Sequence, residues 1–264
     1  MNDGYFEARG AARHISRELA LMLGGGRALL LQVAHPLVAA GVSEHSGYRE
    51  NPWQRLEGTM NTVWAIVFGS RDQADRAARR VRSMHGRVHG RTREPMGPFP
   101  AGTAYSALDP ELLLWVHATL VDTAILVHGQ WVRPLGEAEQ SAYYEEMKTI
   151  ARLFGTPEDV IPATLADFRA YMTRMLSSPE ICVTPTAREI ADAVMHPPLP
   201  LVLRPGMEAV NLVTAGLMPK QLRHDYGLSW DPARSLALRA SREGVRRIAM
   251  PLIPARLRTV PAAR

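Results

Sequence analysis

Histidines inside strongly apolar segments are the first feature of this sequence that could do chemistry. Of its nine histidines, His35 lies in LLLQVAHPLVAA and His117 in LLLWVHATLVDT, with His128 further along the same segment. A histidine in apolar surroundings needs partners for its ring nitrogens, because an unpaired buried polar group costs free energy. One such residue is more often a satisfied core histidine than a ligand. Several of them in one small domain favour a metal or cofactor site.

His85 and His89 lie four residues apart in VRSMHGRVHG, within a helix expected over residues 72–88. Side chains four apart share a helix face, so both could reach one metal, although a non-haem site would need further ligands. The alternative is a single axial histidine on haem iron, with a wide apolar slot for the porphyrin. The residues alone leave both alternatives open.

Arg55 and Thr59 lie one helical turn apart in WQRLEGTMNTVW. They therefore project from one face, where a guanidinium can hold a carboxylate such as a haem propionate and the hydroxyl can add a hydrogen bond. A surface arginine beside a helix-facing threonine is the other interpretation, and spacing alone favours it.

The elements that must position these residues are predicted to be helices almost throughout. Pro36 should divide an apolar helix over residues 27–41, and the glycines at 24–26 should end a helix over residues 9–23. Asp109 and Pro110 open a helix that is apolar on nearly every side, which is typical of a central buried helix. Further helices are expected over residues 53–68, 138–154, 165–176, 186–196, 207–217 and 235–247.

No run alternates apolar and polar residues for long enough to predict a strand. We therefore expect an all-α fold and a single domain over residues 1–264, with a tail from about residue 250 that can be extended. The half from residue 131 onward should complete the pocket. Met207, Asn211 and Thr214 share a helix face in that half, a pattern more typical of core than of a site.

Composition excludes several classes. Hydrophobic residues make up 46% and the net charge is +5, with arginines gathered at residues 71–93 and 234–264. Such runs are usually solvated helix faces, although they can favour haem propionates, nucleic acid or a lipid surface. No aromatic residues interleave them, so we expect no nucleic-acid partner. The sequence has no P-loop, HExxH or GxSxG motif.

The start of the chain does not look like a secretory signal, because acidic residues interrupt it and no apolar core follows a basic start. The longest uninterrupted apolar stretches are far shorter than the roughly 20 residues that span a bilayer. We therefore expect a cytoplasmic protein without an integral membrane segment. A homodimer is among the assemblies that the sequence allows.

Four ordered elements give the sequence a resemblance to a known family. They are LLLQVAHPLVAAGVSEHSGY, the Arg55 to Thr59 element, VRSMHGRVHG and YSALDPELLLWVHATLVDT, between residue 27 and about residue 130. Together they resemble the MpaB-type oxygenases, which include rubber oxygenase. The resemblance implies a globin-like helical bundle that encloses a pocket for haem b, with His85 as the iron ligand and His89 as the second choice. It also implies that Arg55 and Thr59 line that pocket, where we also place His117.

One position departs from the family. Rubber oxygenase has a lysine directly before the threonine of this element, which can occupy the distal iron position, and this sequence has Gly58. The distal side should therefore be open, bound to water or filled by another side chain. Glu44, His45 and Tyr48 are the candidates.

Three functions follow from these residues. The first is a haem-dependent oxygenase or oxidase that acts on a small hydrophobic substrate, isoprenoid-like or aromatic, with dioxygen or peroxide. Arg55 would hold a propionate or polarise bound oxygen, and Glu44, with His45 beside it, would remove a substrate proton. The second is a non-catalytic haem-binding or sensor protein, which needs no distal base. The third is a structural or interaction protein whose histidines are merely buried.

Overall fold

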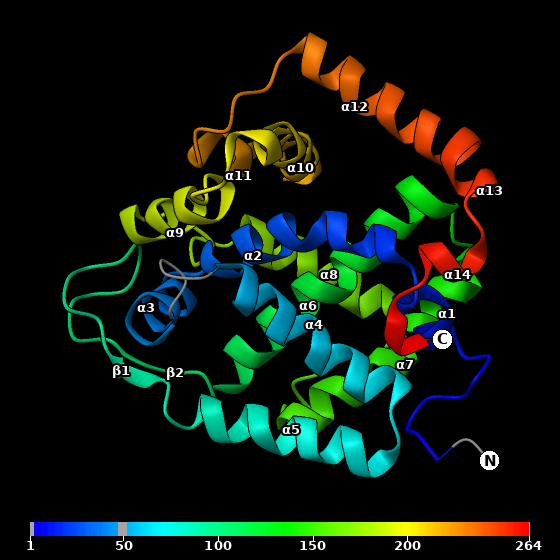
Figure 1. Ribbon diagram of the computed structural model, residues 1–264. Helices are drawn as coiled ribbons and strands as arrows, with labels where there is room; N and C mark the ends of the chain where they lie inside the picture. Colours follow the sequence, from blue (N-terminus) through cyan, green and yellow to red (C-terminus); the bar gives the residue numbers. More distant parts are fainter. Residues whose placement is uncertain (1–2, 47–51, 264) are drawn as a thin grey trace.

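Helices dominate the structure, a computed structural model in which one short hairpin is the only sheet among the described residues (Figure 1). The description covers residues 3–46 and 52–263, without the side chains of residues 52–56 and 249. The predicted all-α class is confirmed. Its main core gathers side chains from α2, α3, α4, α6, α7, α8 and α9.

The chain begins with α1 (Ala11–Ser16) and the 3-10 helix η1 (Leu19–Gly24), followed by α2 (Gly25–Val33) and α3 (Pro36–His45). The predicted division at Pro36 is confirmed, and η1–α2 and α3 meet at 107°. His35 caps α3, since its Nδ1 accepts a hydrogen bond from the Leu37 N–H at 3.3 Å.

The prediction that glycines 24–26 end a long helix is wrong, because they lie where η1 passes directly into α2. A Cβ on Gly24 would lie 2.4 Å from the Thr123 side chain, and one on Gly26 would lie 2.3 Å from Thr214. These glycines are therefore needed for close packing of α2 on its neighbours.

Helix α4 (Pro52–Phe68) packs against α5 (Arg71–His85), which Ser70 opens with a capping box to Gln73. The hairpin follows, with β1 (His89–Arg91) antiparallel to β2 (Ala104–Ser106) and Gly90 opposite Tyr105. We predicted no strand here. Strands of three residues are too short to show an alternating pattern.

The hairpin also corrects the prediction that His85 and His89 share one helix face. Helix α5 ends at His85, and His89 opens β1. The two side chains therefore do not share a helix face, and the idea of a shared metal loses its geometric basis.

The central helix is α6 (Pro110–Val127), which Asp109 caps as predicted. It continues into the π-helical turn η2 (His128–Val132), and α7 (Glu137–Phe154) returns beside it. By length and composition Pro110–Val132 could cross a membrane, but 61% of its most apolar window is buried in the protein. Burial of this kind is typical of a core helix.

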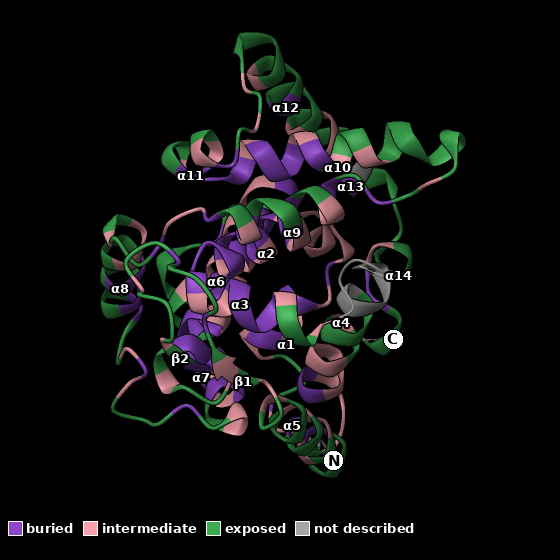
Figure 2. Ribbon diagram, turned by 90° about the vertical axis from the view of Figure 1, so that its left-hand side faces the viewer, coloured by how far each residue is buried: buried purple, intermediate pink, exposed green. Residues whose placement is uncertain are grey.

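The second half adds α8 (Leu165–Ser177), α9 (Pro185–Met195), the 3-10 turn η3 (Leu201–Leu203), α10 (Arg204–Leu217) and α11 (Lys220–Asp225). Helix α12 (Pro232–Gly244) runs along the edge of the molecule and buries only Leu238 (Figure 2). The tail forms a π-helical turn (Val245–Ala249) and the short helices α13 (Met250–Leu252) and α14 (Ala255–Arg258). The chain then returns to its start, where the Val260 N–H donates to the Arg17 carbonyl.

Candidate functional site

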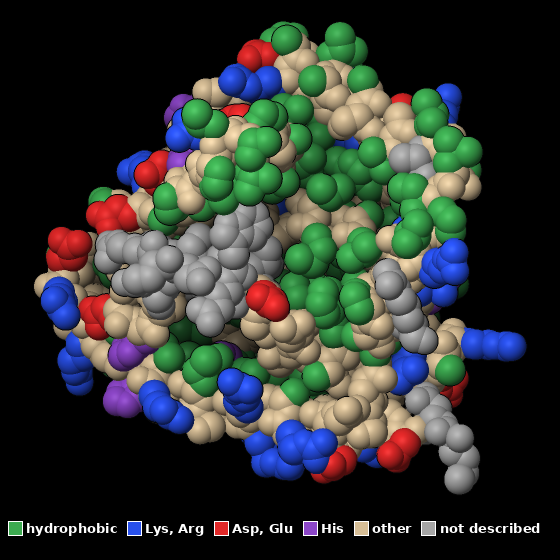
Figure 3. Space-filling model, viewed as in Figure 1, with side chains coloured by type: hydrophobic (Ala, Val, Ile, Leu, Met, Phe, Trp, Pro, Cys, Tyr) green, Lys and Arg blue, Asp and Glu red, His purple; other side chains and the backbone are tan. Residues whose placement is uncertain are grey.

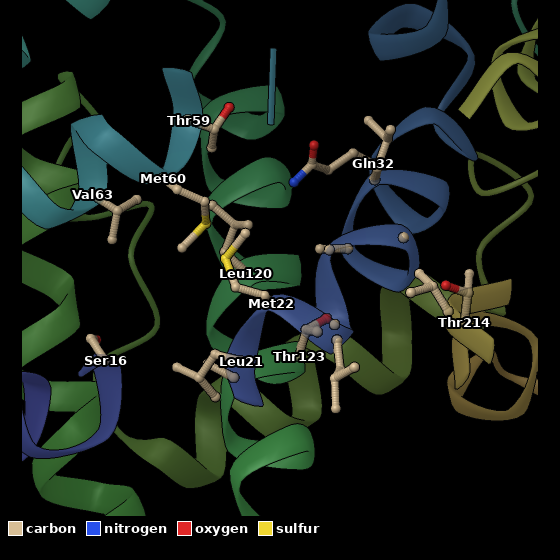
Figure 4. A pocket seen from close by; sticks show the side chains of 18 of the residues that line it. Ser16, Leu21, Met22, Gln32, Thr59, Met60, Val63, Leu120, Thr123 and Thr214 are labelled. Atoms are coloured by element: carbon tan, nitrogen blue, oxygen red, sulfur yellow. The ribbon is translucent and has the colours of Figure 1, made fainter. Parts of the chain in front are cut away.

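A cavity of about 380 Å³ lies between η1, α2, α4, α6, α7 and α10 (Figure 4). Its volume lies within the range of about 300–1,000 Å³ that is usual for small-molecule sites. The walls are mostly apolar, with side chains such as Leu29 on α2, Trp64 on α4 and Leu120 on α6. The predicted role of the second half is also met, because α7, α9 and α10 close the cavity.

Five methionines lie in this wall: Met22, Met60, Met147, Met195 and Met207. Methionine has an unbranched, polarizable side chain that adapts its shape to a neighbour. The aromatic contribution is smaller, with Trp64, Tyr143 and Phe154. The wall can therefore adapt its shape to an apolar ligand.

His117 is the titratable side chain of special interest on this wall. It is buried on α6, and its Nε2 has no hydrogen-bond partner. Burial lowers the pKa of His117 to about 4, although a hydrogen bond to the Met147 backbone acts in the opposite direction. The ring is thus neutral at neutral pH, and because the Met147 backbone fixes the other nitrogen, Nε2 presents a free lone pair.

Other polar groups on the wall are few. Thr59 lies on α4 at the exposed edge of the cavity, and Gln32 reaches from α2 towards the α4 side (Figure 4). The Gln32 amide donates to the Thr119 hydroxyl at 3.2 Å. Asn211 on α10 donates from Nδ2 to the Met195 carbonyl at 2.8 Å, while its buried Oδ1 has no partner.

A buried cation braces the cavity from behind. Arg27 on α2 donates to the Leu217 carbonyl on α10, to the Thr123 hydroxyl and to the Asp122 carboxylate, the last at 2.7 Å. These bonds tie three wall helices together. Arg27 does not line the cavity, and no Lys or Arg of the described part of the chain does so.

A second, polar site lies where α3 meets the hairpin. The Tyr105 hydroxyl donates to Glu44 Oε2 at 2.6 Å and lies 3.3 Å from His45 Nε2. Arg93 approaches the other oxygen of Glu44 at 3.6 Å. Burial and the hydrogen bond to Glu44 raise the pKa of Tyr105, so the phenol stays a proton donor. We refer to Glu44, His45, Arg93 and Tyr105 as the Tyr105 cluster.

Gly90 makes room for this tyrosine. A Cβ on Gly90 would lie 2.6 Å from the Tyr105 hydroxyl. The side chain therefore crosses its partner strand and reaches the end of α3. Beside the cluster, His45 and the end of α5 line a second hollow of about 330 Å³.

His85 lies half-buried at the end of α5, next to residues that line this second hollow. Its buried Nδ1 has no hydrogen-bond partner, and burial lowers the pKa of His85. His85 is not among the described residues that line the large cavity.

The predicted site residues therefore divide into groups. Thr59 and His117 lie on the large cavity, while Glu44 and His45 meet at the Tyr105 cluster. The side chain of Arg55 and the whole of Tyr48 lie outside the described residues. Among the residues that are described, no three His, Cys, Asp or Glu side chains form a group that could hold a metal ion.

Sequence reasoning missed the role of α10. Met207, Asn211 and Thr214 do share a helix face, as predicted, but that face forms the cavity wall instead of ordinary core. The signal that could have found it is the polar Asn211 and Thr214 on an otherwise apolar face, because buried polar side chains need partners.

Comparison with known proteins places most of this chain in one family. The family model of the catalytic domain of ER-bound oxygenase mpaB/B′ and rubber oxygenase matches residues 12–247. The match extends through α10 and α12, well beyond the motif-rich part, so the whole cavity lies inside it. The chain belongs to this family of oxygenase catalytic domains.

Its relatives include the uncharacterized proteins Mb2261 of Mycobacterium bovis and Rv2237 of Mycobacterium tuberculosis. Each is 27% identical over 211 residues, which cover 78% of this chain and 80% of the relative. No solved structure matches the chain. Membership of an oxygenase family supports oxygenase activity in general and implies an iron-type cofactor, dioxygen and a substrate.

Proposed function

We propose that this protein is a haem-b-dependent oxygenase or oxidase that converts a small hydrophobic substrate with dioxygen or peroxide. The observation that carries the proposal is the apolar cavity with the buried, unpartnered Nε2 of His117 on its wall. Neutral imidazole is the commonest protein ligand of metals, and haem iron in globins and peroxidases is held by a histidine.

Two histidines, each with one buried ring nitrogen, support a haem. A buried imidazole nitrogen without a partner is costly unless something else binds it, and both His85 and His117 have one. We assign His85 as the iron ligand on the family pattern, and His117 and Thr59 to contacts with the cofactor. A propionate needs a cation, and the described cavity wall supplies none, so we assign this contact to Arg55.

When bound, haem iron would supply the binding and activation of dioxygen or peroxide. The chain's own residues do the rest. The apolar wall excludes water and holds the substrate. Glu44 accepts a substrate proton, and the hydrogen bond from Tyr105 fixes the carboxylate that receives it. His45 lies beside the same hydroxyl and completes the acid–base group.

The cavity also supports a substrate class. Its adaptable, methionine-rich wall suits an isoprenoid-like chain. The unpartnered Oδ1 of Asn211 is an acceptor, so it favours a ligand with one hydroxyl or N–H donor. A hydrophobic alcohol meets both conditions.

A non-catalytic haem binder or sensor is the second candidate. The observation that favours it is that neither Glu44 nor His45 is among the described residues on the cavity wall. A binder needs the cavity and the iron ligand without a base beside the substrate.

Haem reconstitution of the purified protein tests the proposal. We expect a Soret band in the wild type and in His89→Ala, and its loss in His85→Ala, because the histidine ligand would hold the non-covalent haem. His117→Ala should keep the band but shift it, since this residue contacts the cofactor without ligating iron. A band that survives His85→Ala and vanishes in His117→Ala would contradict our choice of ligand. No Soret band in the wild type would contradict haem altogether.

A further inference from the structure

The last segment of the chain is one of two that concentrate positive charge. Residues 232–264 contain eight arginines and one acidic residue, Glu243, which gives this segment a net charge of +7. The whole chain carries +5, so residues 1–231 carry −2. Residues 71–93 carry a second arginine excess, with eight arginines against two aspartates, so charge alone does not single out the last segment.

The same part of the molecule leaves large apolar side chains in solvent. Ten large hydrophobic residues are exposed in the described part of the chain, and eight of them lie between Leu201 and Leu257. The exposed fractions reach 83% for Val202, 76% for Leu252 and 75% for Leu201. Single exposed hydrophobic residues are normal, but eight in one quarter of the chain mark an interaction surface.

The arginines among them are only partly neutralised within the protein. Arg239 and Arg256 are exposed and form no ion pair with any described residue. Arg246 and Arg247 share the single carboxylate of Glu243. We refer to Leu201–Leu203 together with the exposed side chains of residues 234–258 as the C-terminal surface.

This surface borders the cavity. Turn η3 passes directly into α10, and Leu203 lies one helical turn before Met207, which lines the cavity. Figure 3 shows hydrophobic side chains gathered across the upper part of one face, around a hollow, with basic side chains at the edges. The exposed apolar turn therefore continues directly into α10, the helix that forms one part of the cavity wall.

We propose that the C-terminal surface binds the surface of an anionic lipid bilayer. Apolar side chains beside arginines are the combination that lies in a membrane interface, where the apolar groups enter the acyl boundary and the guanidinium groups meet lipid phosphates. A second copy of this chain fits less well, because a two-fold interface would set these arginines against their own copies. The surface places α10, and with it the cavity, next to the lipid.

This inference does not depend on the bound cofactor or on turnover. If hydrophobic substrates reach the cavity from the bilayer, that route rests on the proposed function as well. Vesicle binding by the full chain tests the surface alone, so its failure leaves the oxygenase proposal standing.

The experiment is flotation with phosphatidylcholine vesicles, with and without phosphatidylglycerol. We expect the wild type to float only with the anionic vesicles and to be released when NaCl rises from about 0.1 M to about 0.5 M, because salt screens exposed charges. Arg239→Gln with Arg256→Gln should weaken binding by more than about tenfold, since each arginine near an anionic surface contributes about 1 kcal/mol. Leu201→Ser with Val202→Ser should weaken it comparably without lowering the melting temperature, because both side chains are exposed.

Matched controls lie elsewhere on the molecule. Met84→Ser with Leu108→Ser changes the two exposed hydrophobic residues outside the surface, and Arg79→Gln with Arg80→Gln changes exposed arginines of α5. These variants should bind like the wild type. The proposal is overturned if the wild type does not float, if the α5 variants lose binding while the surface variants keep it, or if sedimentation shows a wild-type dimer that the surface substitutions dissociate.

Discussion

The large cavity and the Tyr105 cluster differ in how the chain builds them. The cavity takes its wall from eight elements that span residues 16 to 214, and its polar atoms are few and partly unpartnered. The cluster joins the end of α3 to the hairpin, and its hydroxyl contacts both the carboxylate and the imidazole. A cavity whose polar atoms lack hydrogen-bond partners is suited to receive a ligand. A polar cluster whose hydrogen bonds are already made is suited to hold one proton acceptor in place.

The difference shows which parts of a site short sequence motifs can predict. His85, from the family pattern, and His117, which we added, are both predicted to lie near the cofactor, and each has one free nitrogen. Only His117 lies on the described cavity wall. Glu44 and His45 come from one short motif and do meet, because they are neighbours at the end of one helix. Three predictions separate the two sites.

The largest expected effect is on turnover. Glu44→Gln should lower kcat about 10²- to 10⁴-fold, because loss of a positioned general base costs this much. The measurement is oxygen uptake with a hydrophobic isoprenoid alcohol as the probe. Glu94→Gln, an exposed carboxylate nearby in the chain, is the control and should retain full turnover. Normal turnover in Glu44→Gln would remove the Tyr105 cluster from the reaction and leave the cavity alone.

Packing of the cavity wall gives the next effect. Gly26→Ala should lower the free energy of unfolding by about 1–3 kcal/mol, because its Cβ would lie 2.3 Å from the Thr214 hydroxyl and overpack the contact of α2 with α10. Urea unfolding measures this loss.

The matched control is Gly244→Ala at the end of α12, where nothing lies within 4 Å of the new methyl group. It should be neutral or slightly stabilising, by up to about 1 kcal/mol. In a Thr214→Ala background the loss from Gly26→Ala should shrink, since the clashing atoms are gone. An equal loss in both backgrounds would show that contact with the Thr214 side chain is not the cause of the lost stability.

The smallest effect concerns acid stability at the start of α3, the helix that carries Glu44. Burial lowers the pKa of His35 to about 4, although the negative charge of Asp109 acts in the opposite direction. As pH falls from about 6.5 to about 4, the unfolded chain takes up a proton that folded His35 does not, so stability is full above this window and falls through it.

His35→Asn keeps a cap acceptor for the Leu37 N–H and removes this proton. The slope of unfolding free energy against pH should decrease by up to about 1.4 kcal/mol per pH unit in that window. His117 and His128, whose pKa values burial also lowers to about 4, keep the remaining slope. An unchanged slope would mean that His35 binds its proton equally in both states.

The sequence by itself determined what depends on a few neighbouring residues. Asp109 and Thr164 open the helices that their cap chemistry predicts, and Pro36 divides the apolar segment. Helical periodicity found the bounds of α7 and α8 closely. The family resemblance likewise needed only local motifs, and the family match confirms it.

Only the tertiary structure decided what those helices enclose. It turned glycines 24–26 from a helix end into a close packing contact, and it brought the α10 face of Asn211 and Thr214 onto the cavity. It also placed His85 and His89 on different elements and brought the Tyr105 hydroxyl within hydrogen-bond distance of Glu44. The physical reason is range. Caps and periodicity act within a turn or two, while a cavity wall and a buried free nitrogen exist only where distant helices pack together.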